Sequence, residues 1–317
     1  MVGVSERGVG GIATLYEVIS VTVRVPAKVN LQLSVGPLRD DGYHDLVNVF
    51  HAVSLFDEVT ATPAGRLTVR VSGESIEGVP TDGDNLAARA ARLLADRTGN
   101  VPAVDLHIRK AIPVAGGMAG GSADAAAALV ACNELWQAGL ERDELLELAS
   151  ELGSDVPFAL LGGTAVGLGR GERLTSAMVR GRFHWVFACA DGGLSTPAVY
   201  AECDRLRSAY EEPVSWPHTS EDLMAALATG DAKALGKALR NDLQPAALTL
   251  RGSLRRTLTA GREFGALGSL VSGSGPTCAF LTGSEAHAVD LAVGLSGMGV
   301  ARSVERAYGP VAGATVL

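Results

Sequence analysis

Residues 111–136 read AIPVAGGMAGGSADAAAALVACNELW, and the elements on either side of this stretch set the architecture. Four of the six residues from 116 to 121 are glycines, and an alanine-rich run follows them directly. Alanine has the highest helix propensity, and a helix commonly ends at a glycine, here Gly139. Residues 104–108 alternate apolar and polar side chains, as a short strand does. The sequence therefore predicts a strand, a glycine loop and a helix in succession.

The glycine loop is suited to holding an anion. Without side chains, its backbone N–H groups can surround a phosphate, and the dipole of the following helix points the same way. Ser122, at the helix start, could cap the helix, bind a phosphate oxygen or bind a metal ion. The alternative is a flexible loop whose glycines only let helix and strand pack closely. The position of the loop between a strand and a helix favours phosphate binding.

The best-known phosphate loops do not match this one. No Gly-Lys-Ser/Thr ends the loop, as a Walker A motif requires, and no Val-Ala-Ile-Lys or His-Arg-Asp follows, as in protein kinases. The dinucleotide fingerprint fits poorly because Met118 occupies its third position and no acidic residue closes a strand about 20 positions on. The sequence therefore predicts a phosphate loop of another kind.

Outward from the loop, helices and strands mix without a regular alternation. Strands are predicted at 19–34, with Pro26 at a bulge or edge, and at 47–54, 183–190, 269–281 and 300–306; helices are predicted at 85–97, 142–152, 197–210 and 219–240. We expect Asp84 to cap the helix at 85–97. A doubly covered parallel sheet would need steady strand–helix alternation, so the α+β class fits better.

The chain is long enough for two domains. At roughly 150 residues per domain, 317 residues suggest two, and the pattern of elements restarts near Glu172. We expect a nucleotide-binding domain at residues 1–172 and a substrate-binding, closing domain at 173–317. Residues 1–18 show no clear periodicity and are expected to form a flexible extension.

Composition narrows the function classes. With 27 Lys and Arg against 35 Asp and Glu, the net charge of -8 argues against a general nucleic-acid binder. No long apolar stretch and no signal-peptide pattern is present, so no membrane partner is expected. The four cysteines have no paired spacing, which is typical of reduced thiols. These features predict a cytoplasmic enzyme.

Two charged residues outside the loop add a chemical meaning to it. Lys28 stands among apolar residues in PAKVNL (26–31), and Asp155 lies between a helix and an apolar segment in GSDVPF (153–158). Each has an ordinary alternative, namely a surface lysine and a helix-cap or turn aspartate. Together with a phosphate loop, they supply a base for a hydroxyl proton and a cation for the transferring phosphoryl group. The set predicts a phosphoryl transferase.

Four segments resemble, in order, the motifs of the GHMP kinases. They are PAKVNL (26–31), the loop at 113–123, GSDVPF (153–158) and SGSGP (272–276). The resemblance extends over most of the chain. It implies a two-domain fold with the active site in the cleft between the domains, a small-molecule alcohol as acceptor, ATP as co-substrate and Mg²⁺ bound with the ATP.

Two further segments resemble one branch of this family. DGYH (41–44) and TPAVY (196–200) are similar to segments of the kinases that phosphorylate a cytidine-diphosphate-linked methylerythritol in the non-mevalonate route to isoprenoid precursors. The resemblance implies that Tyr43 and Tyr200 sandwich the cytosine ring and that His44 hydrogen-bonds its edge. The alternatives are a solvated hairpin tip for Tyr43 and His44, and a helix core position for Tyr200.

The resemblance also implies roles for single residues. Asp155 would activate the attacking hydroxyl, while Lys28 would keep that carboxylate ionised and stabilise charge on the phosphoryl group. Asn30 would hold the erythritol hydroxyls, with Thr196 in the same pocket, and Asn85 would lie towards adenine. The implied ATP-binding loop comprises Pro113, Val114, Ala115, Gly116, Gly117, Met118, Ala119, Gly120, Gly121, Ser122 and Ala123, and the implied substrate-side loop comprises Gly273, Ser274 and Gly275.

Two positions depart from the usual family loop, GLGGGSS. Ala119 adds a methyl group where the backbone approaches phosphate, and Ala123 lacks the second hydroxyl, which leaves the Mg²⁺ ligand unknown. Ser122 is a candidate ligand and Asp124 a less favoured one, its alternative being a first-turn acid at the helix dipole. Other interpretations are a GHMP kinase acting on homoserine, mevalonate or a sugar, a nucleotide-binding protein without turnover and, more remotely, a dinucleotide oxidoreductase.

Overall fold

The computed structural model describes residues 20–74, 76–114, 116–209 and 214–317. The expected extension at residues 1–18 lies outside these ranges. An eight-stranded sheet contains β1 (Val21–Leu38), β2 (His44–Pro63), β3 (Thr68–Gly73), β4 (Val104–Lys110), β5 (Thr164–Gly169), β6 (Arg173–Ser176), β8 (Arg240–Asn241) and β12 (Thr315–Val316). Its central order is β12-β1-β2-β4-β3, while β5 pairs with β2 and β6, and β8 pairs with β1.

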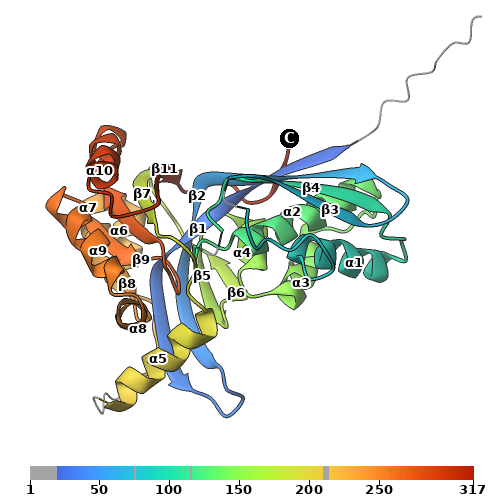
Figure 1. The fold of residues 1–317 in the computed structure, drawn as a ribbon. Coiled ribbons are helices and arrows are strands. Elements are labelled where there is room, and N and C mark those ends of the chain that lie inside the picture. The colour runs from blue at the N-terminus through green and yellow to red at the C-terminus, as the bar shows by residue number, and fades with distance from the viewer. Residues whose placement is uncertain (1–19, 75, 115, 210–213) are drawn as a thin grey trace, which may run out of the picture.

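Four helices pack beside this sheet, in the half of the molecule on the right of Figure 1. They are α1 (Leu86–Thr98), α2 (Gly120–Leu135), α3 (Arg142–Leu152) and α4 (Val156–Leu161). The alanine-rich α2 is the central one, in contact with β1 and β2 on one side and with the other three helices on the other. Small alanine side chains let α2 approach both layers closely, which explains why this helix is buried almost all round.

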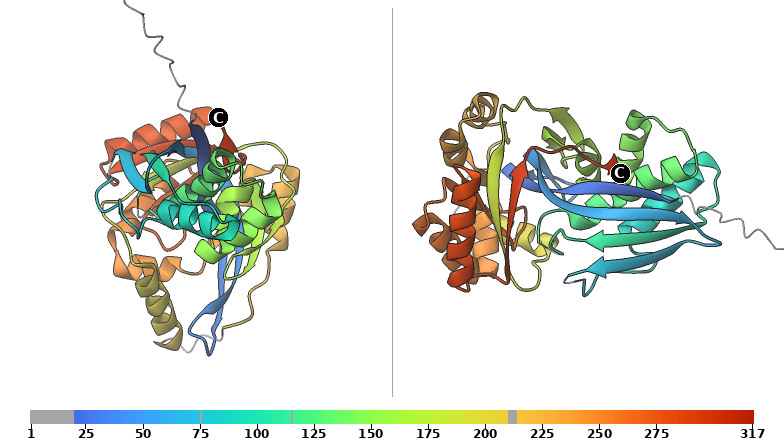
Figure 2. Two further views of the ribbon diagram at one scale, coloured as in Figure 1. Left: turned by 90° about the vertical axis from the view of Figure 1, so that its right-hand side faces the viewer. Right: turned by 90° about the horizontal axis from the view of Figure 1, so that it is seen from above.

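A second sheet forms the other half of the molecule (Figures 1 and 2). Its four antiparallel strands follow the order β11 (Ser303–Gly309), β7 (Phe183–Cys189), β10 (Cys278–Thr282) and β9 (Gly268–Val271). The helices of this half are α5 (Thr196–Ala209), α6 (Glu221–Thr229), α7 (Ala232–Ala238), α8 (Gln244–Leu250), α9 (Ser253–Glu263) and α10 (Glu285–Gly297). The arrangement confirms the α+β prediction, and one continuous buried cluster joins the two sheets.

The long hairpin of β1 and β2 connects the two halves. Figure 1 shows it in blue, crossing the molecule and ending beside α5. A register shift between Pro26 and Ala27 confirms the predicted bulge at this proline. Successive β1 side chains point to opposite faces, and both faces are covered, so Lys28 and Asn30 are as buried as the apolar Val29 between them. The hairpin therefore carries polar side chains into the interior between the halves.

Several predicted boundaries need correction. Asp84 does not cap α1, because Asn85 is the N-cap and accepts a hydrogen bond from the N–H of Ala87. The helix α2 ends at Leu135 and not at Gly139. The single helix predicted at 219–240 is two helices, since Gly230 adopts a left-handed C-cap conformation and Asp231 caps the next helix. The helix predicted at 142–152 is confirmed at both ends.

The cysteines behave as the sequence predicts. All four are free and buried. Within the described ranges, no helix is long and apolar enough to cross a membrane.

Candidate active site

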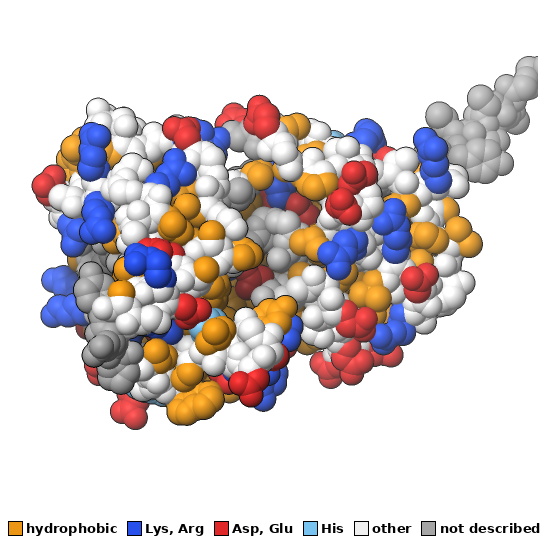
Figure 3. Space-filling model, turned by 60° about the horizontal axis from the view of Figure 1, so that its bottom comes forward, with side chains coloured by type: hydrophobic (Ala, Val, Ile, Leu, Met, Phe, Trp, Pro, Cys, Tyr) orange, Lys and Arg blue, Asp and Glu red, His pale blue; other side chains and the backbone are white. Residues whose placement is uncertain are grey.

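A cavity of about 490 Å³ lies between the two halves, and both contribute to its walls. Figure 3 shows the surface hollowed there. One side consists of β1, β2, the loop before α2 and the start of α4, and the other of α5 and residues 273–275. This matches the expected cleft between two domains.

Lys28 and Asp155 meet in this cavity. Lys28 Nζ lies 3.6 Å from Asp155 Oδ2, although the residues come from β1 and from the start of α4. Lys28 Nζ also donates a hydrogen bond of 2.7 Å to Asn30 Oδ1, and Asn30 Nδ2 donates one of 3.0 Å to Asn48 Oδ1. The Asp155 side chain makes no capping bond to α4. Its carboxylate is thus directed at the lysine and not at the helix N-terminus.

The glycine loop lies at the N-terminus of α2, along the cavity wall. The helix begins at Gly120, after Ala119 in a left-handed conformation, so Ser122 lies inside the first turn. Of the three roles left open for Ser122, helix capping is thereby excluded. Ser122 is partly exposed and lines the cavity. Of the predicted loop residues, the cavity is lined by Pro113, Val114, Gly116, Gly117, Ala119, Gly120, Gly121 and Ser122, whereas Met118 and Ala123 are buried and Ala115 is outside the described residues.

The glycines of this loop have a packing role in addition. A Cβ on Gly117 would lie 2.2 Å from the carbonyl oxygen of Ser272, and one on Gly116 would lie 2.8 Å from Thr277 Oγ1. Ser272 Oγ donates a hydrogen bond of 3.1 Å to the carbonyl oxygen of Gly117. The loop of the first sheet is thus held directly against residues 272–277 of the second, with no room for side chains between them.

Residues 273–275 face Lys28 and Asp155 from the opposite wall. A Cβ on Gly273 would lie 3.4 Å from Lys28 Nζ, so the backbone passes close to the lysine. Asn241 Nδ2 holds this loop with a hydrogen bond of 2.7 Å to the Gly273 carbonyl oxygen. Thr196 Oγ1 lies 2.9 Å from Ser274 Oγ, and both residues line the cavity. The structure therefore brings together the predicted substrate-side residues Asn30, Thr196 and the loop at 273–275.

The predicted cytosine-binding residues are only partly assembled. Tyr200 lines the cavity, and its ring stacks on His44 with a centroid distance of 5.6 Å. Burial, reinforced by the charge of Asp155, raises the pKa of the Tyr200 hydroxyl. Tyr43 is about half exposed, at 51%, and its ring lies under the guanidinium of Arg170. Neither Tyr43 nor His44 lines the cavity as it stands.

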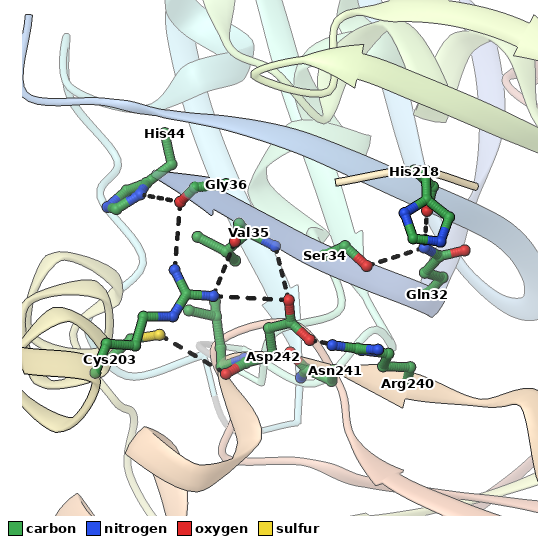
Figure 4. A network of polar contacts seen from close by, with 12 residues as sticks. Gln32, Ser34, Val35, Gly36, His44, Cys203, His218, Arg240, Asn241 and Asp242 are labelled. Carbon is green, nitrogen blue, oxygen red and sulfur yellow. Dashed lines mark hydrogen bonds and ion pairs between the residues drawn. The ribbon is translucent and has the colours of Figure 1, made fainter. Parts of the chain in front are cut away.

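His44 is held by a polar network at the end of the β1–β2 hairpin (Figure 4). Its Nδ1 lies 2.9 Å from the carbonyl oxygen of Gly36, and its Nε2 lies 3.2 Å from Asp204 Oδ2 on α5. Arg207 donates to the same Gly36 carbonyl and to that of Val35. A carbonyl oxygen only accepts, so Nδ1 carries a proton and the ring orientation is fixed.

A buried charge cluster beside the loop was missed by sequence reasoning. Lys110 Nζ contacts Asp57 Oδ2 at 2.5 Å and Asp124 Oδ2 at 2.7 Å, and all three side chains are buried. Burial alone would lower the pKa of Lys110, but the two carboxylates together raise it. Burial raises the pKa of the Asp124 carboxyl well above its usual value, against the effect of Lys110. Lysine scarcity is the one signal that could have singled out Lys110.

The Asn85 side chain stabilises the start of α1. It is buried, its Oδ1 caps α1 and its Nδ2 donates a hydrogen bond of 2.7 Å to the Pro80 carbonyl oxygen. The side chain does not line the cavity, whereas Pro80 does. Its expected position near adenine stays a prediction.

Comparison with known proteins gives the class of the chain. The model of the GHMP kinases N terminal domain matches residues 85–163, and the model of the GHMP kinases C terminal domain matches residues 223–300. Together with the relatives below, these matches show that the chain belongs to the GHMP kinases. The resemblance found in the motifs is thereby confirmed.

Several relatives that match most of the chain share one name. A protein of Thermobifida fusca (strain YX), named 4-diphosphocytidyl-2-C-methyl-D-erythritol kinase, is 61% identical over 306 residues, covering 94% of this chain and 98% of the relative. One of the same name from Mycolicibacterium smegmatis is 59% identical and covers 94% of this chain and 92% of the relative. A crystal structure of 4-(cytidine 5'-diphospho)-2C-methyl-D-erythritol kinase matches with a TM-score of 0.74 at 32% identity, covering 90% of this chain and 98% of that one.

Proposed function

We propose that the protein transfers the γ-phosphoryl group of ATP to a hydroxyl of 4-(cytidine 5'-diphospho)-2-C-methyl-D-erythritol, giving the 2-phosphate and ADP. The reaction belongs to the non-mevalonate route to isoprenoid precursors. The single observation that carries the proposal is the meeting of Lys28 and Asp155 at 3.6 Å beside the glycine loop. The names of relatives at about 60% identity support the choice of substrate.

The catalytic step follows from the positions of these two residues. The Asp155 carboxylate accepts the proton of the substrate hydroxyl as its oxygen attacks the γ-phosphorus. Lys28 Nζ, between Asp155 and Asn30, stabilises negative charge on the attacking oxygen and the phosphoryl group. Since Lys28 is almost fully buried, little water screens this interaction. ADP then leaves with the electrons of the broken P–O bond.

ATP phosphates are expected at the N-terminus of α2. The cavity-lining backbone of Gly116, Gly117 and Gly120 offers N–H groups there. The positive end of the α2 dipole lies at the same place and favours the negatively charged phosphates. Mg²⁺ takes oxygen ligands and keeps contacts to nucleotide phosphates. The Ser122 hydroxyl, on a side chain that lines the cavity, suits such an ion, whereas one Asp124 oxygen is already engaged by Lys110. The ion would neutralise charge on the phosphates, with Ser122 as its proposed protein ligand.

The proposal is tested by the purified protein with Mg-ATP and the cytidine-diphosphate-linked alcohol. Asp155→Asn should lower kcat by roughly 10²–10⁴-fold while ATP still binds, because the hydroxyl proton loses its acceptor. Asp143→Asn, an exposed aspartate in the first turn of α3, is the matched control and should keep wild-type kcat. Full activity of Asp155→Asn would remove this residue from the mechanism.

Substrate choice is tested separately. Wild-type enzyme should release ADP with the cytidine-diphosphate-linked alcohol and not with homoserine, mevalonate or a free sugar, and cytidine diphosphate should compete with the alcohol. ADP release with one of the other acceptors would assign the chain to a different reaction in the family. ATP binding without ADP release from any acceptor would indicate a binding protein.

A further inference from the structure

Arg170 is a charged residue of the cavity that takes no part in the proposed phosphoryl transfer. It lies in the turn between β5 and β6 and lines the cavity. The turn is fixed by hydrogen bonds from the Arg170 N–H to Glu172 Oε2, at 2.7 Å, and from the Gly171 N–H to the Leu168 carbonyl oxygen, at 3.1 Å. The backbone of Arg170 is therefore anchored, while the residue remains exposed and lines the cavity.

The Arg170 side chain is placed over an aromatic ring. Its guanidinium carbon lies 3.8 Å from the centroid of the Tyr43 ring. Such a cation–π contact orients the planar guanidinium over the ring without locking it. The face of Tyr43 that Arg170 covers belongs to the residue expected to stack on the base of the substrate.

Arg170 differs from the two lysines that line the cavity, because each lysine has a carboxylate partner. Lys28 pairs with Asp155, and Lys110 pairs with Asp57 and Asp124. Within the described ranges, no carboxylate lies within ion-pair distance of the Arg170 guanidinium. Arg170 thus brings a positive charge to the cavity that the protein itself does not neutralise, and this favours an anionic ligand.

We propose that Arg170 binds the diphosphate of the acceptor substrate. The inference rests on the proposed function, because it takes the acceptor to be a nucleoside diphosphate derivative. In that substrate the diphosphate joins the base, expected at Tyr43, to the alcohol, expected at Asp155, and Arg170 lines the same cavity beside Tyr43. A guanidinium presents five N–H donors in a planar fork that matches two phosphate oxygens. Arg170 is then a specificity-determining residue that selects diphosphate-linked acceptors.

The experiment is a calorimetric titration of wild-type protein with cytidine diphosphate, cytidine monophosphate and cytidine. Wild-type affinity should fall in that order. In Arg170→Ala, cytidine diphosphate should bind roughly 10- to 100-fold more weakly, since hydrogen bonds between charged groups are lost. Cytidine should change by less than about threefold, and the KM for ATP should stay at its wild-type value. Arg170→Lys keeps the positive charge but lacks the planar fork of N–H donors. Its affinity for cytidine diphosphate should lie between those of the wild type and Arg170→Ala.

Arg173→Ala is the matched control. Arg173 is an exposed arginine on β6, three positions further along the same hairpin, and does not line the cavity. This variant should bind all three ligands as the wild type does. Its result shows whether the loss in Arg170→Ala is a general effect of removing positive charge from this hairpin.

Each outcome separates the inference from the function it rests on. If wild-type protein does not bind cytidine diphosphate, the proposed function fails. If wild-type protein binds it and Arg170→Ala binds it within threefold as well, the inference is overturned while the function stands. Equal losses for cytidine and cytidine diphosphate would also overturn it, because Arg170 would then act only through Tyr43.

Discussion

Gly117 and Ala119 both have positive φ angles in the phosphate loop, at 74° and 60°, but their surroundings differ. A Cβ at position 117 would lie 2.2 Å from the Ser272 carbonyl oxygen, which belongs to the loop of the second sheet. Ala119 already carries a Cβ as the N-cap of α2. The residue that departs from the family loop therefore holds a methyl group in the left-handed conformation, which costs about 1–2 kcal/mol.

Two alanine–glycine exchanges test this difference. Gly117→Ala should push the phosphate loop away from residue 272, lower the free energy of unfolding by about 1–3 kcal/mol and raise the KM for ATP at least tenfold. Ala119→Gly should change the free energy of unfolding by less than about 1 kcal/mol, because relief of the left-handed strain is offset by the flexibility of glycine in the unfolded chain. Denaturant unfolding and ATP saturation curves measure both effects.

Similar KM values for the two variants would contradict this account. They would mean that the loop adapts to an added methyl group without losing its fit to ATP.

Single residues were predicted from sequence where a local motif carried them. Lys28 and Asp155 each stand in a short recognisable segment, and they do meet. Asp57 and Arg170 do not stand in a recognisable segment. Their roles depend on contacts with Lys110 and Tyr43, which are distant from them in sequence. Local patterns cannot encode a partner of that kind, so the charge cluster and the arginine over Tyr43 needed the structure.

Among the elements, β2, β4 and α2 are tied together by the buried cluster of Asp57, Lys110 and Asp124. Asp57 also accepts backbone hydrogen bonds from Ala111 and Ile112, at 2.6 and 2.8 Å, where the chain leaves β4 towards the glycine loop. The cluster therefore fixes both ends of the phosphate loop, the strand before it and the helix after it.

Lys110→Met should destabilise the protein strongly. It leaves two buried carboxylates without their cation, and breaking a buried pair in this way costs about 3–5 kcal/mol. Arg109→Met, at the neighbouring position of β4, removes a pair with Glu58 whose arginine is 61% exposed and should cost no more than about 1 kcal/mol. Equal urea midpoints for the two variants would show that the buried cluster contributes no more than a surface pair.

Two helices show how the spacing of apolar side chains helped or hindered their prediction. The helix at 142–152 has its buried residues on one face and was predicted to the residue. In α10, Leu291 and Leu295 are buried while Val289 and Val293 are exposed, so apolar side chains lie on more than one face and no helix was predicted there. The short strands β8 and β12, of two residues each, give no periodic signal at all.

Across the whole molecule, His51 lies where the two sheets meet. It belongs to β2, and its ring centroid is 6.0 Å from that of Phe183 and 6.1 Å from that of Trp185, both on β7. Complete burial lowers its pKa to about 3, so it stays neutral in the folded protein. In the unfolded chain the same side chain takes up a proton near its usual pKa of 6.5.

This difference predicts acid sensitivity of the whole fold. Above pH 6.5 the histidine is neutral in both states and contributes no pH dependence. As the pH falls from 6.5 towards 3, only the unfolded state is protonated, so the free energy of unfolding should fall by up to about 1.4 kcal/mol per pH unit from this group. His51→Gln should remove that component of the slope, as measured by urea unfolding between pH 7 and pH 4.

His287→Gln, at a partly exposed position of α10, is the matched control and should keep the wild-type slope. An unchanged slope in His51→Gln would place the acid sensitivity in other groups.

Whole-molecule organisation was predicted in outline. The restart of the pattern near Glu172 indicated two domains, and the boundary itself stays a prediction. Residues 240–241 and 315–316 pair with β1 in the first sheet, although most of the chain around them packs with the second. Nothing in these two short segments indicates that they pair with β1, which lies far earlier in the sequence. The sequence pattern therefore did not predict their pairing with the first sheet.

The pairing of β12 with β1 has a consequence for synthesis on the ribosome. Val316 pairs with Val23, so one edge of β1 stays unpaired there until translation has passed residue 316. An open strand edge is a template for pairing with other chains. The nascent polypeptide therefore carries this open edge while the residues between the two strands are made, a period in which a ribosome-associated chaperone would protect it from pairing with other chains.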